Sequence, residues 1–195
     1  MRAFIAIEIP PKIKAELSSL SNQLHSNLVG QSIRWLPIEN IHLTLKFFKE
    51  LPRKDIDLVS TIMRELMAEY LPFNLKLNEL GVFPHPNRPQ VIWLGIKQHS
   101  RLYKLQEDLS EELVKLAYPA ERRTFSPHLT LGRLRRNVPS SDFAQINQAV
   151  QNVIVDASCV FTVKEALLFR SELSANGAKY TKLFGAKLGN AKRSP

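Results

Sequence analysis

The segment Ile41-His-Leu-Thr-Leu-Lys-Phe-Phe48 organises the chain, because its first half returns later as Pro127-His-Leu-Thr-Leu-Gly-Arg133. In both copies leucine alternates with histidine and threonine, which is typical of a strand with one buried and one polar face. His42 and Thr44 therefore share a face, as do their counterparts in the second copy. If the two strands lie side by side, we expect two imidazoles and two hydroxyls to converge, an arrangement suited to proton transfer around a phosphate.

The composition indicates a folded domain with a basic surface. The chain has 195 residues, of which 44% are hydrophobic and 23% charged, and it carries a formal net charge of +9. A chain of this length buries a sizeable core as one domain or as two packed halves. The excess of positive charge favours a polyanionic partner, and nucleic acid is the commonest one.

The sequence also predicts where the protein works. Its single cysteine, Cys159, excludes an internal disulfide and fits a reducing cytoplasm. The chain begins with a strand-like segment in place of a secretion signal, and no apolar run reaches the roughly 18 residues of a transmembrane helix. We therefore expect a soluble, cytoplasmic protein that does not associate with membranes.

Hydrophobic periodicity outlines the other elements. Apolar residues recur at helical spacing over residues 10–28, 54–70, 100–118 and about 140–152, and the last of these helices has Ser140 or Ser141 as its expected cap. Alternating residues predict strands at 2–9, 32–36, 73–80, 90–96 and 153–163. The proline-rich stretch 83–89 is expected to be a loop.

Two stretches of the chain share one order of elements. Residues 1–82 and about 90–163 each read strand, helix, His-Leu-Thr-Leu strand, helix, strand, which an internal duplication explains most simply. Duplicated units commonly pack about an approximate two-fold axis, so we expect one domain over 1–195 with two pseudo-symmetric lobes. An Asn-Gly turn signal at Asn176 predicts a closing hairpin over about 165–184.

The chain resembles the 2H phosphoesterase superfamily, and within it the bacterial and archaeal RNA 2′,3′-cyclic phosphodiesterases once described as 2′-5′ RNA ligases. The resemblance covers nearly the whole chain and rests on residues 34–48, on residues 125–133 and on the closing hairpin at 171–180. It implies an α+β fold of two lobes, each with a mainly antiparallel sheet and helices outside. The two sheets line a central groove that is open to RNA ends.

The same resemblance implies hydrolysis of a terminal 2′,3′-cyclic phosphate of RNA to a 2′-phosphomonoester, without a metal or another cofactor. Opening the ring needs a base that activates water and an acid that protonates the departing ribose oxygen. Histidine, with an ordinary pKa of about 6.5, suits both roles. The repeated motif alone does not say which histidine takes which role; the resemblance implies that His42 is the proton donor and His128 the proton acceptor.

Further side chains are candidates for binding the phosphate. Thr44 and Thr130 would donate hydroxyl hydrogen bonds to its non-bridging oxygens. Arg133 could clamp it through two N–H groups, although strict alternation puts this residue on the face opposite His128, so that a bend is required. Strict alternation also puts Lys46 on the same face as His42 and Thr44, where it either adds positive charge to the site or is an ordinary solvated lysine.

Several alternatives stay open on the sequence alone. RNA 2′-5′ ligation or 2′-5′ phosphodiester cleavage would use the same residues, because ligation is hydrolysis with a 5′-hydroxyl in place of water. A non-catalytic RNA-binding module would also account for the charge. A zinc site is disfavoured, since neither motif has the carboxylate or thiolate that such sites commonly recruit. The expected partner is RNA with a cyclic phosphate end, tRNA fragments included, and the expected state is a monomer.

Overall fold

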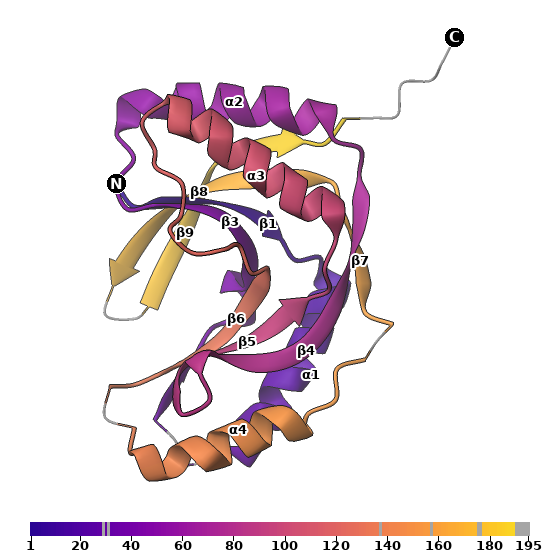
Figure 1. Ribbon diagram of the computed structural model, residues 1–195, viewed down its shortest axis with the longest axis vertical. Helices are drawn as coiled ribbons and strands as arrows, with labels where there is room; N and C mark the ends of the chain where they lie inside the picture. The colour runs from indigo at the N-terminus through magenta and orange to yellow at the C-terminus, as the bar shows by residue number, and fades with distance from the viewer. Residues whose placement is uncertain (29, 31, 137, 157, 175–176, 190–195) are drawn as a thin grey trace.

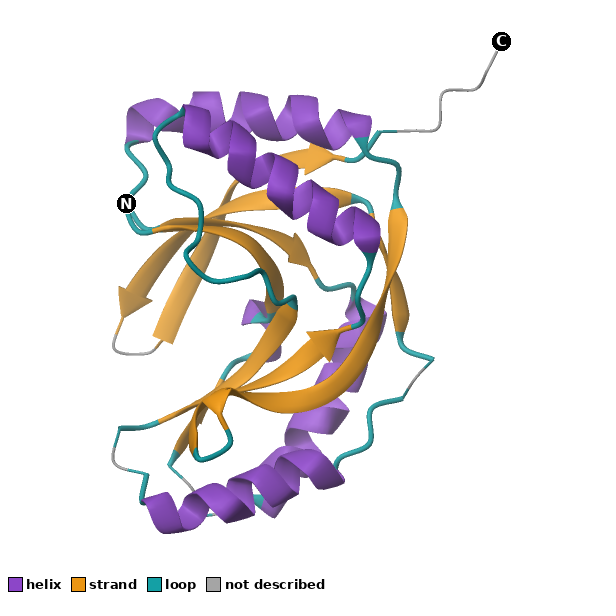
Figure 2. Ribbon diagram, viewed as in Figure 1, coloured by secondary structure: helices purple, strands orange, loops and turns teal. Residues whose placement is uncertain are grey.

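The computed structural model describes residues 1–28, 30, 32–136, 138–156, 158–174 and 177–189, and it confirms the predicted α+β class (Figure 1 and Figure 2). The helices are α1 (Pro11–Asn27), α2 (Ile56–Glu69), α3 (Ser100–Lys115) and α4 (Phe143–Asn152). The strands are β1 (Ala3–Glu8), β2 (Ile33–Trp35), β3 (His42–Phe48), β4 (Phe73–His85), β5 (Arg88–Ile96), β6 (His128–Leu134), β7 (Val160–Val163), β8 (Glu165–Ser174) and β9 (Gly177–Lys187). Short 3-10 turns at Ile38–Asn40, Arg53–Asp55 and Ser140–Asp142 precede β3, α2 and α4.

The strands form one curved antiparallel sheet in the order β7-β4-β5-β6-β3-β1-β8-β9, with β2 paired to β6 off this path. This order is symmetric about the contact between β6 and β3, where Leu43 pairs with Leu129. One half of the sheet consists of β3, β1, β8 and β9, and the other of β6, β5, β4, β7 and β2. The two sheets predicted from the sequence are these halves, joined along β3 and β6.

The helices cover the outer sides of the two halves (Figure 1). α2 and α3 lie together over the half that contains β1, β3, β8 and β9, while α1 and α4 lie together against the other half. Their buried faces are those that the periodicity predicts. In α3, for example, the leucines at 102, 105, 109 and 113 are fully buried. Each buried leucine side chain stabilises the fold by ~1.5–3 kcal/mol, which holds the helix against the sheet.

The prediction of a loop at 83–89 is wrong. β4 continues to His85 and β5 begins at Arg88, and within this stretch Phe83 pairs with Val91. Proline lacks a backbone N–H and is tolerated at strand ends and bulges, where no ladder hydrogen bond is lost. The prolines here mark the tip of a β-hairpin, and a register irregularity follows Phe83.

Three other boundaries differ from the prediction. α4 is preceded by the turn Ser140–Asp142 and has Asp142 as its N-cap residue without a side-chain cap hydrogen bond, so the predicted serine cap is wrong. β7 starts at Val160, well after residue 153. α3 ends at Lys115, since Ala117 adopts a positive φ of 63°, a conformation that a helix does not continue through.

The division into sequence repeats 1–82 and 90–163 remains a prediction. β4 from the first stretch pairs with β5 from the second, and β8 pairs with β1, so each half of the sheet draws strands from both stretches or from the hairpin. The hairpin predicted at 165–184 forms as β8 and β9, which pair from Glu165 with Lys187 to Ser174 with Gly177. Its turn is predicted at 175–177, of which residues 175 and 176 lie outside the described residues and Gly177 begins β9.

Candidate active site

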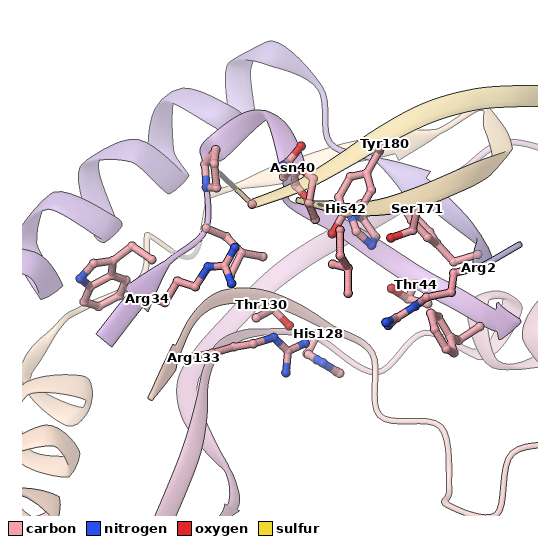
Figure 3. Close-up of a pocket in the computed structure, with 18 residues that line it drawn as sticks. Arg2, Arg34, Asn40, His42, Thr44, His128, Thr130, Arg133, Ser171 and Tyr180 are labelled. Carbon is pink, nitrogen blue, oxygen red and sulfur yellow. Dashed lines mark hydrogen bonds between the residues drawn. The ribbon is translucent and has the colours of Figure 1, made fainter. Parts of the chain in front are cut away.

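The two His-Leu-Thr-Leu segments lie on neighbouring antiparallel strands, β3 and β6, at the centre of the sheet. Their first leucines, Leu43 and Leu129, are fully buried in the core. The histidines and threonines are half-buried and line one cavity of about 610 Å³ (Figure 3). The structure thus brings together the four residues predicted from the repeated motif, namely His42, Thr44, His128 and Thr130.

Each of these strands carries a β-bulge directly after its threonine. In β3 the pairing with β1 jumps from Thr44 opposite Ala6 to Lys46 opposite Ile5, so Leu45 is the extra residue. In β6 the pairing with β5 jumps at the equivalent place, which makes Leu131 the extra residue. An extra residue reverses which face the following side chains occupy.

The bulges place Arg133 and Phe47 at the cavity and turn Lys46 into the interior. The bend that the prediction required for Arg133 therefore exists. The expectation that Lys46 shares the face of the motif threonine is wrong, because this residue is only 3% exposed. Its ammonium donates to the backbone oxygen of Pro119 and lies 3.9 Å from the Glu121 carboxylate. Burial lowers the pKa of the Lys46 ammonium, and Glu121 opposes that shift.

The backbone orients both imidazoles in the same way. The Nδ1 atom of His42 lies 2.7 Å from the backbone oxygen of Asn40, and that of His128 lies 2.7 Å from the backbone oxygen of Ser126. A carbonyl oxygen can only accept a hydrogen bond, so Nδ1 carries the hydrogen in each ring. Nε2 is then the nitrogen that gains or loses the titrating proton, as a general acid or base requires.

Aromatic side chains fix the planes of the two imidazoles. Phe4 of β1 stacks on His42 with ring centroids 4.4 Å apart, and Tyr180 of β9 meets the same imidazole edge-on at 5.4 Å. On the other half of the sheet, Phe83 of β4 meets His128 edge-on at 5.0 Å. Because each ring is held by the backbone at Nδ1 and by aromatic faces or edges, its Nε2 atom keeps a defined direction.

The pKa of each catalytic histidine candidate lies below the usual 6.5. Burial is the main cause at both, since it disfavours the charged imidazolium, and the hydrogen bond to the backbone carbonyl opposes the shift. The charge of His128 further lowers the pKa of His42, and the charge of Arg133 further lowers the pKa of His128. An anion bound between the two rings raises both pKa values, because it favours the charged forms.

Three arginines give the cavity a positive potential. Arg34 of β2 lies opposite Arg133 of β6 in the strand pairing, and Arg2 precedes β1 with its guanidinium carbon 5.4 Å from the centre of the Phe47 ring. None of the described residues that line this cavity is an aspartate or glutamate. A site with three guanidinium groups and no carboxylate attracts phosphate.

Sequence reasoning misses several residues of this cavity. Asn40 is one: its side-chain amide donates to the backbone oxygen of Ala178, 3.0 Å away, while its own backbone oxygen orients His42 (Figure 3). It therefore connects the β8–β9 hairpin to a motif histidine. Tyr180, Arg2 and Arg34 are further examples, and they reach the site through strand pairing over long sequence distances. The signal that could have found Asn40 is a polar residue two positions before each motif histidine.

Within the described part of the chain, no group of three or more histidine, cysteine, aspartate or glutamate side chains is placed to hold a metal ion. That part also contains no helix with the length and apolar character needed to cross a membrane. The chemistry that the cavity offers comes from imidazole, hydroxyl and guanidinium groups.

Comparison with known proteins places this arrangement in a family. Residues 9–174 match the family model of the 2′-5′ RNA ligase superfamily. The chain belongs to this superfamily. The match confirms the resemblance to 2H phosphoesterases that the two His-Leu-Thr-Leu segments indicate.

Two relatives of this superfamily member align over almost their whole length. The RNA 2′,3′-cyclic phosphodiesterase of Methanothermobacter thermautotrophicus is 32% identical over 181 residues, which cover 93% of this chain and 95% of that protein. The enzyme of the same name from Archaeoglobus fulgidus is 27% identical over 183 residues, which cover 94% of this chain and 98% of that protein.

Solved structures show that the fold is shared. The Thermus thermophilus protein TT0787 superposes with a TM-score of 0.82 at 25% identity, and the match covers 98% of this chain and 100% of that one. Escherichia coli LigT complexed with 3′-AMP superposes with a TM-score of 0.75 at 24% identity, covering 97% of this chain and 98% of that one.

Proposed function

We propose that the protein hydrolyses the 2′,3′-cyclic phosphate at the end of an RNA to a 2′-phosphomonoester, by acid–base catalysis with two histidines and without a metal ion. The observation that carries this proposal is the pair of imidazoles in one cavity, each with Nδ1 tied to a backbone carbonyl and Nε2 left for proton transfer. The relatives named RNA 2′,3′-cyclic phosphodiesterase support the choice of substrate.

The proposed reaction is one in-line displacement at phosphorus. His128 accepts a proton from water at Nε2 while the water oxygen bonds to phosphorus. The bond between phosphorus and the ribose 3′ oxygen breaks, and His42 gives that oxygen its Nε2 proton. The products are a 2′-phosphate and a 3′-hydroxyl. General acid and general base catalysis of this kind each contribute a factor of ~10² to 10⁴ in rate.

The remaining groups of the cavity stabilise the charge that develops on phosphate. Thr44 and Thr130 donate hydroxyl hydrogen bonds to the non-bridging oxygens, and Arg133 donates two N–H groups. Arg2 and Arg34 line the same cavity, and their positive charge would attract further phosphates of an RNA chain, which supports RNA as the partner.

The proposal extends to the state in which the protein works. A monomer suffices, because one chain supplies both histidines and both threonines of the cavity. The single, buried, free Cys159 is compatible with a reducing cytoplasm. RNA fragments with cyclic phosphate ends, tRNA fragments among them, are the substrates we would try first.

The test is an assay with a short RNA that ends in a 2′,3′-cyclic phosphate, in the presence of excess EDTA. We expect a 2′-phosphate product from the wild-type protein, and its loss in His42→Ala and His128→Ala variants whose circular dichroism is unchanged. A 3′-phosphate product, or activity that needs an added metal ion, would overturn the proposal. Salt-sensitive RNA binding without turnover would favour a non-catalytic RNA-binding module.

A further inference from the structure

A second cavity, of about 1240 Å³, adjoins the first. One wall is a face of α3 on which Tyr103, Glu107 and Glu111 recur at helical spacing. Another wall is the segment from Leu116 to Pro127 that connects α3 to β6, which we call the strap. The strap is held to β3 by a hydrogen bond, which the ammonium of Lys46 donates to the backbone oxygen of Pro119.

The two cavities meet at one of the two histidines. His128 lines both of them, together with Thr44, Phe47 and Arg133, whereas His42 belongs to the lining of the first cavity alone. A molecule that enters through the second cavity therefore reaches the phosphate position from the His128 side. His128 is the residue to which the proposed reaction assigns the activation of the nucleophile.

The charges of the two cavities differ. Apart from Arg133, which both share, the first cavity has Arg2 and Arg34 and no carboxylate among its described lining residues. With Arg133 counted, the second has three carboxylates, those of Glu107, Glu111 and Glu121, against three cations, and Lys104 outside this lining lies 3.9 Å from Glu107. A polyanion is therefore attracted into the first cavity, whose described charged groups are all cationic, and is opposed at the α3 wall of the second cavity by the carboxylates of Glu107 and Glu111.

The proposed reaction brings two different molecules to phosphorus, namely the RNA with the cyclic phosphate and the nucleophile. In an in-line displacement the nucleophile approaches opposite the leaving oxygen, so the RNA that carries the cyclic phosphate and the attacking molecule lie on opposite sides of phosphorus. Water and the 5′-hydroxyl of a second RNA are alternative nucleophiles, and they give hydrolysis and 2′-5′ ligation respectively. Water is uncharged, whereas a second RNA brings phosphates into the nucleophile side.

We propose that the second cavity is the entrance for the nucleophile, and that its carboxylates select water over the 5′ end of a second RNA. This inference rests on the proposed function and deepens it. In ligation, the 5′-hydroxyl oxygen bonds to phosphorus, its proton passes to His128, and the 3′ oxygen leaves with the proton of His42. The catalytic groups are the same as in hydrolysis, so the choice between the two products lies with the access route and its charge.

The experiment compares product ratios within one reaction mixture. An RNA with a 2′,3′-cyclic phosphate end is incubated with a trinucleotide that has a free 5′-hydroxyl, and the 2′-5′-joined product is divided by the 2′-phosphate product. In the Glu107→Gln/Glu111→Gln variant, we expect this ratio to rise about tenfold at low salt, because two repulsions are removed. Added salt screens the repulsion and should bring the wild-type ratio closer to that of the variant.

Two controls isolate the charge of the cavity wall. The Glu65→Gln/Glu69→Gln variant makes the same change in net charge on exposed positions of α2 that belong to neither cavity lining, and its ratio should equal that of the wild type. The nucleoside adenosine also offers a 5′-hydroxyl but carries no phosphate. With adenosine as acceptor, the wild type and the Glu107→Gln/Glu111→Gln variant should give the same ratio.

The outcomes separate the two proposals. If the wild type makes 2′-phosphate and the variant does not raise the share of joined RNA, the selection by carboxylates is wrong and the proposed hydrolysis stands. An equal rise with adenosine, or in the α2 control, would also overturn the selection, because it would not depend on the charge of the acceptor or on the cavity wall. If the wild type makes no 2′-phosphate, both proposals fail.

Discussion

The two strands that carry the histidines are alike in sequence and differ in their surroundings. On β3, His42 contacts both Phe4 and Tyr180, and the residue that orients it, Asn40, is itself bound to the β8–β9 hairpin. On β6, His128 is oriented by the strap, which carries charged groups into a second cavity. A symmetric motif therefore yields two non-equivalent imidazoles. Acid–base catalysis needs this inequality, because one ring must be protonated while the other is neutral.

A second contrast follows each bulge. β3 continues with the buried Lys46 and then Phe47, and β6 continues at the same two positions with Gly132 and then Arg133. The residue that faces the cavity is thus a ring on one strand and a guanidinium on the other. The buried residue is Lys46 on β3, which places an ammonium group in the interior, and Gly132 on β6, which has no side chain. The shared part of the motif ends at the bulge, and the asymmetric chemistry begins there.

The largest expected effect separates the two histidines by role. His42→Ala and His128→Ala should each lower kcat by ~10² to 10⁴-fold with the natural substrate. A substrate with sulfur in place of the 3′ oxygen has a leaving group that needs no proton. With this substrate, measured by product formation, the loss in His42→Ala should shrink at least about tenfold, whereas the loss in His128→Ala should persist. The reverse pattern would exchange the two roles.

A smaller loss of activity is expected from substitutions at Arg133 and Phe47, the residues that face the cavity after the bulges. Arg133→Ala should lower kcat/KM by about 10²-fold, because a charged bidentate donor to the transition state is lost. Arg133→Lys should recover only part of this, since lysine keeps the charge and loses the fork geometry. Phe47→Ala, at the equivalent place on β3, should change kcat/KM by only a few fold. Equal losses at both positions, measured by initial rates, would contradict the asymmetry.

Substitutions at Gly132 and Lys46, the buried residues that precede Arg133 and Phe47, should lower the stability of the fold. A Cβ atom at Gly132 would lie 3.0 Å from Ile33 Cγ2 and from Trp35 Cε3. Gly132→Ala should therefore cost ~1–3 kcal/mol of the free energy of unfolding through overpacking against β2. Lys46→Met should cost a similar ~1–3 kcal/mol, because the backbone oxygen of Pro119 loses its donor. Chemical denaturation measures both, and a variant as stable as the wild type would show that its neighbours relax at no cost.

The smallest effect concerns pH. A base works when neutral, so the lowered pKa of His128 moves the acidic limb of the kcat/KM profile to lower pH. An acid works when protonated, so the lowered pKa of His42 moves the alkaline limb the same way. We expect a bell-shaped profile centred below pH 6.5, the ordinary value of both groups. The kcat profile should lie at higher pH, because the bound phosphate raises both pKa values. A kcat/KM maximum above 6.5 would contradict this.

The sequence predicts the two strands that carry the candidate histidines, because their signal is local. Alternation over four residues fixes which side chains face the core, and repetition of the segment predicts that the two polar faces meet. His42, Thr44, His128 and Thr130 all line one cavity, as expected. The helices are equally local, and the leucine spacing in α3 predicts the residues that it buries.

The sequence does not predict features that arise from pairing between distant segments. Arg34 meets Arg133 through the pairing of β2 with β6, and Asn40 meets Ala178 across 138 residues of chain. The wrong placement of Lys46 has the same origin, because a bulge is defined by two strands and is invisible in one. The prolines of 83–89 mislead because proline breaks a strand in the middle of a sheet but not at the end of a hairpin.

The paired bulges also change how such a motif is to be searched for in other chains. In a strand without a bulge, every second side chain would face the cavity. In β3 the side chains at 42, 44 and 47 face it, and in β6 those at 128, 130 and 133 do so. The recognisable unit is therefore His-x-Thr-x-x followed by a variable sixth residue. Within this unit the first and third residues carry the shared chemistry. In this chain the sixth residue is what differs at the cavity, since it is Phe47 on β3 and Arg133 on β6.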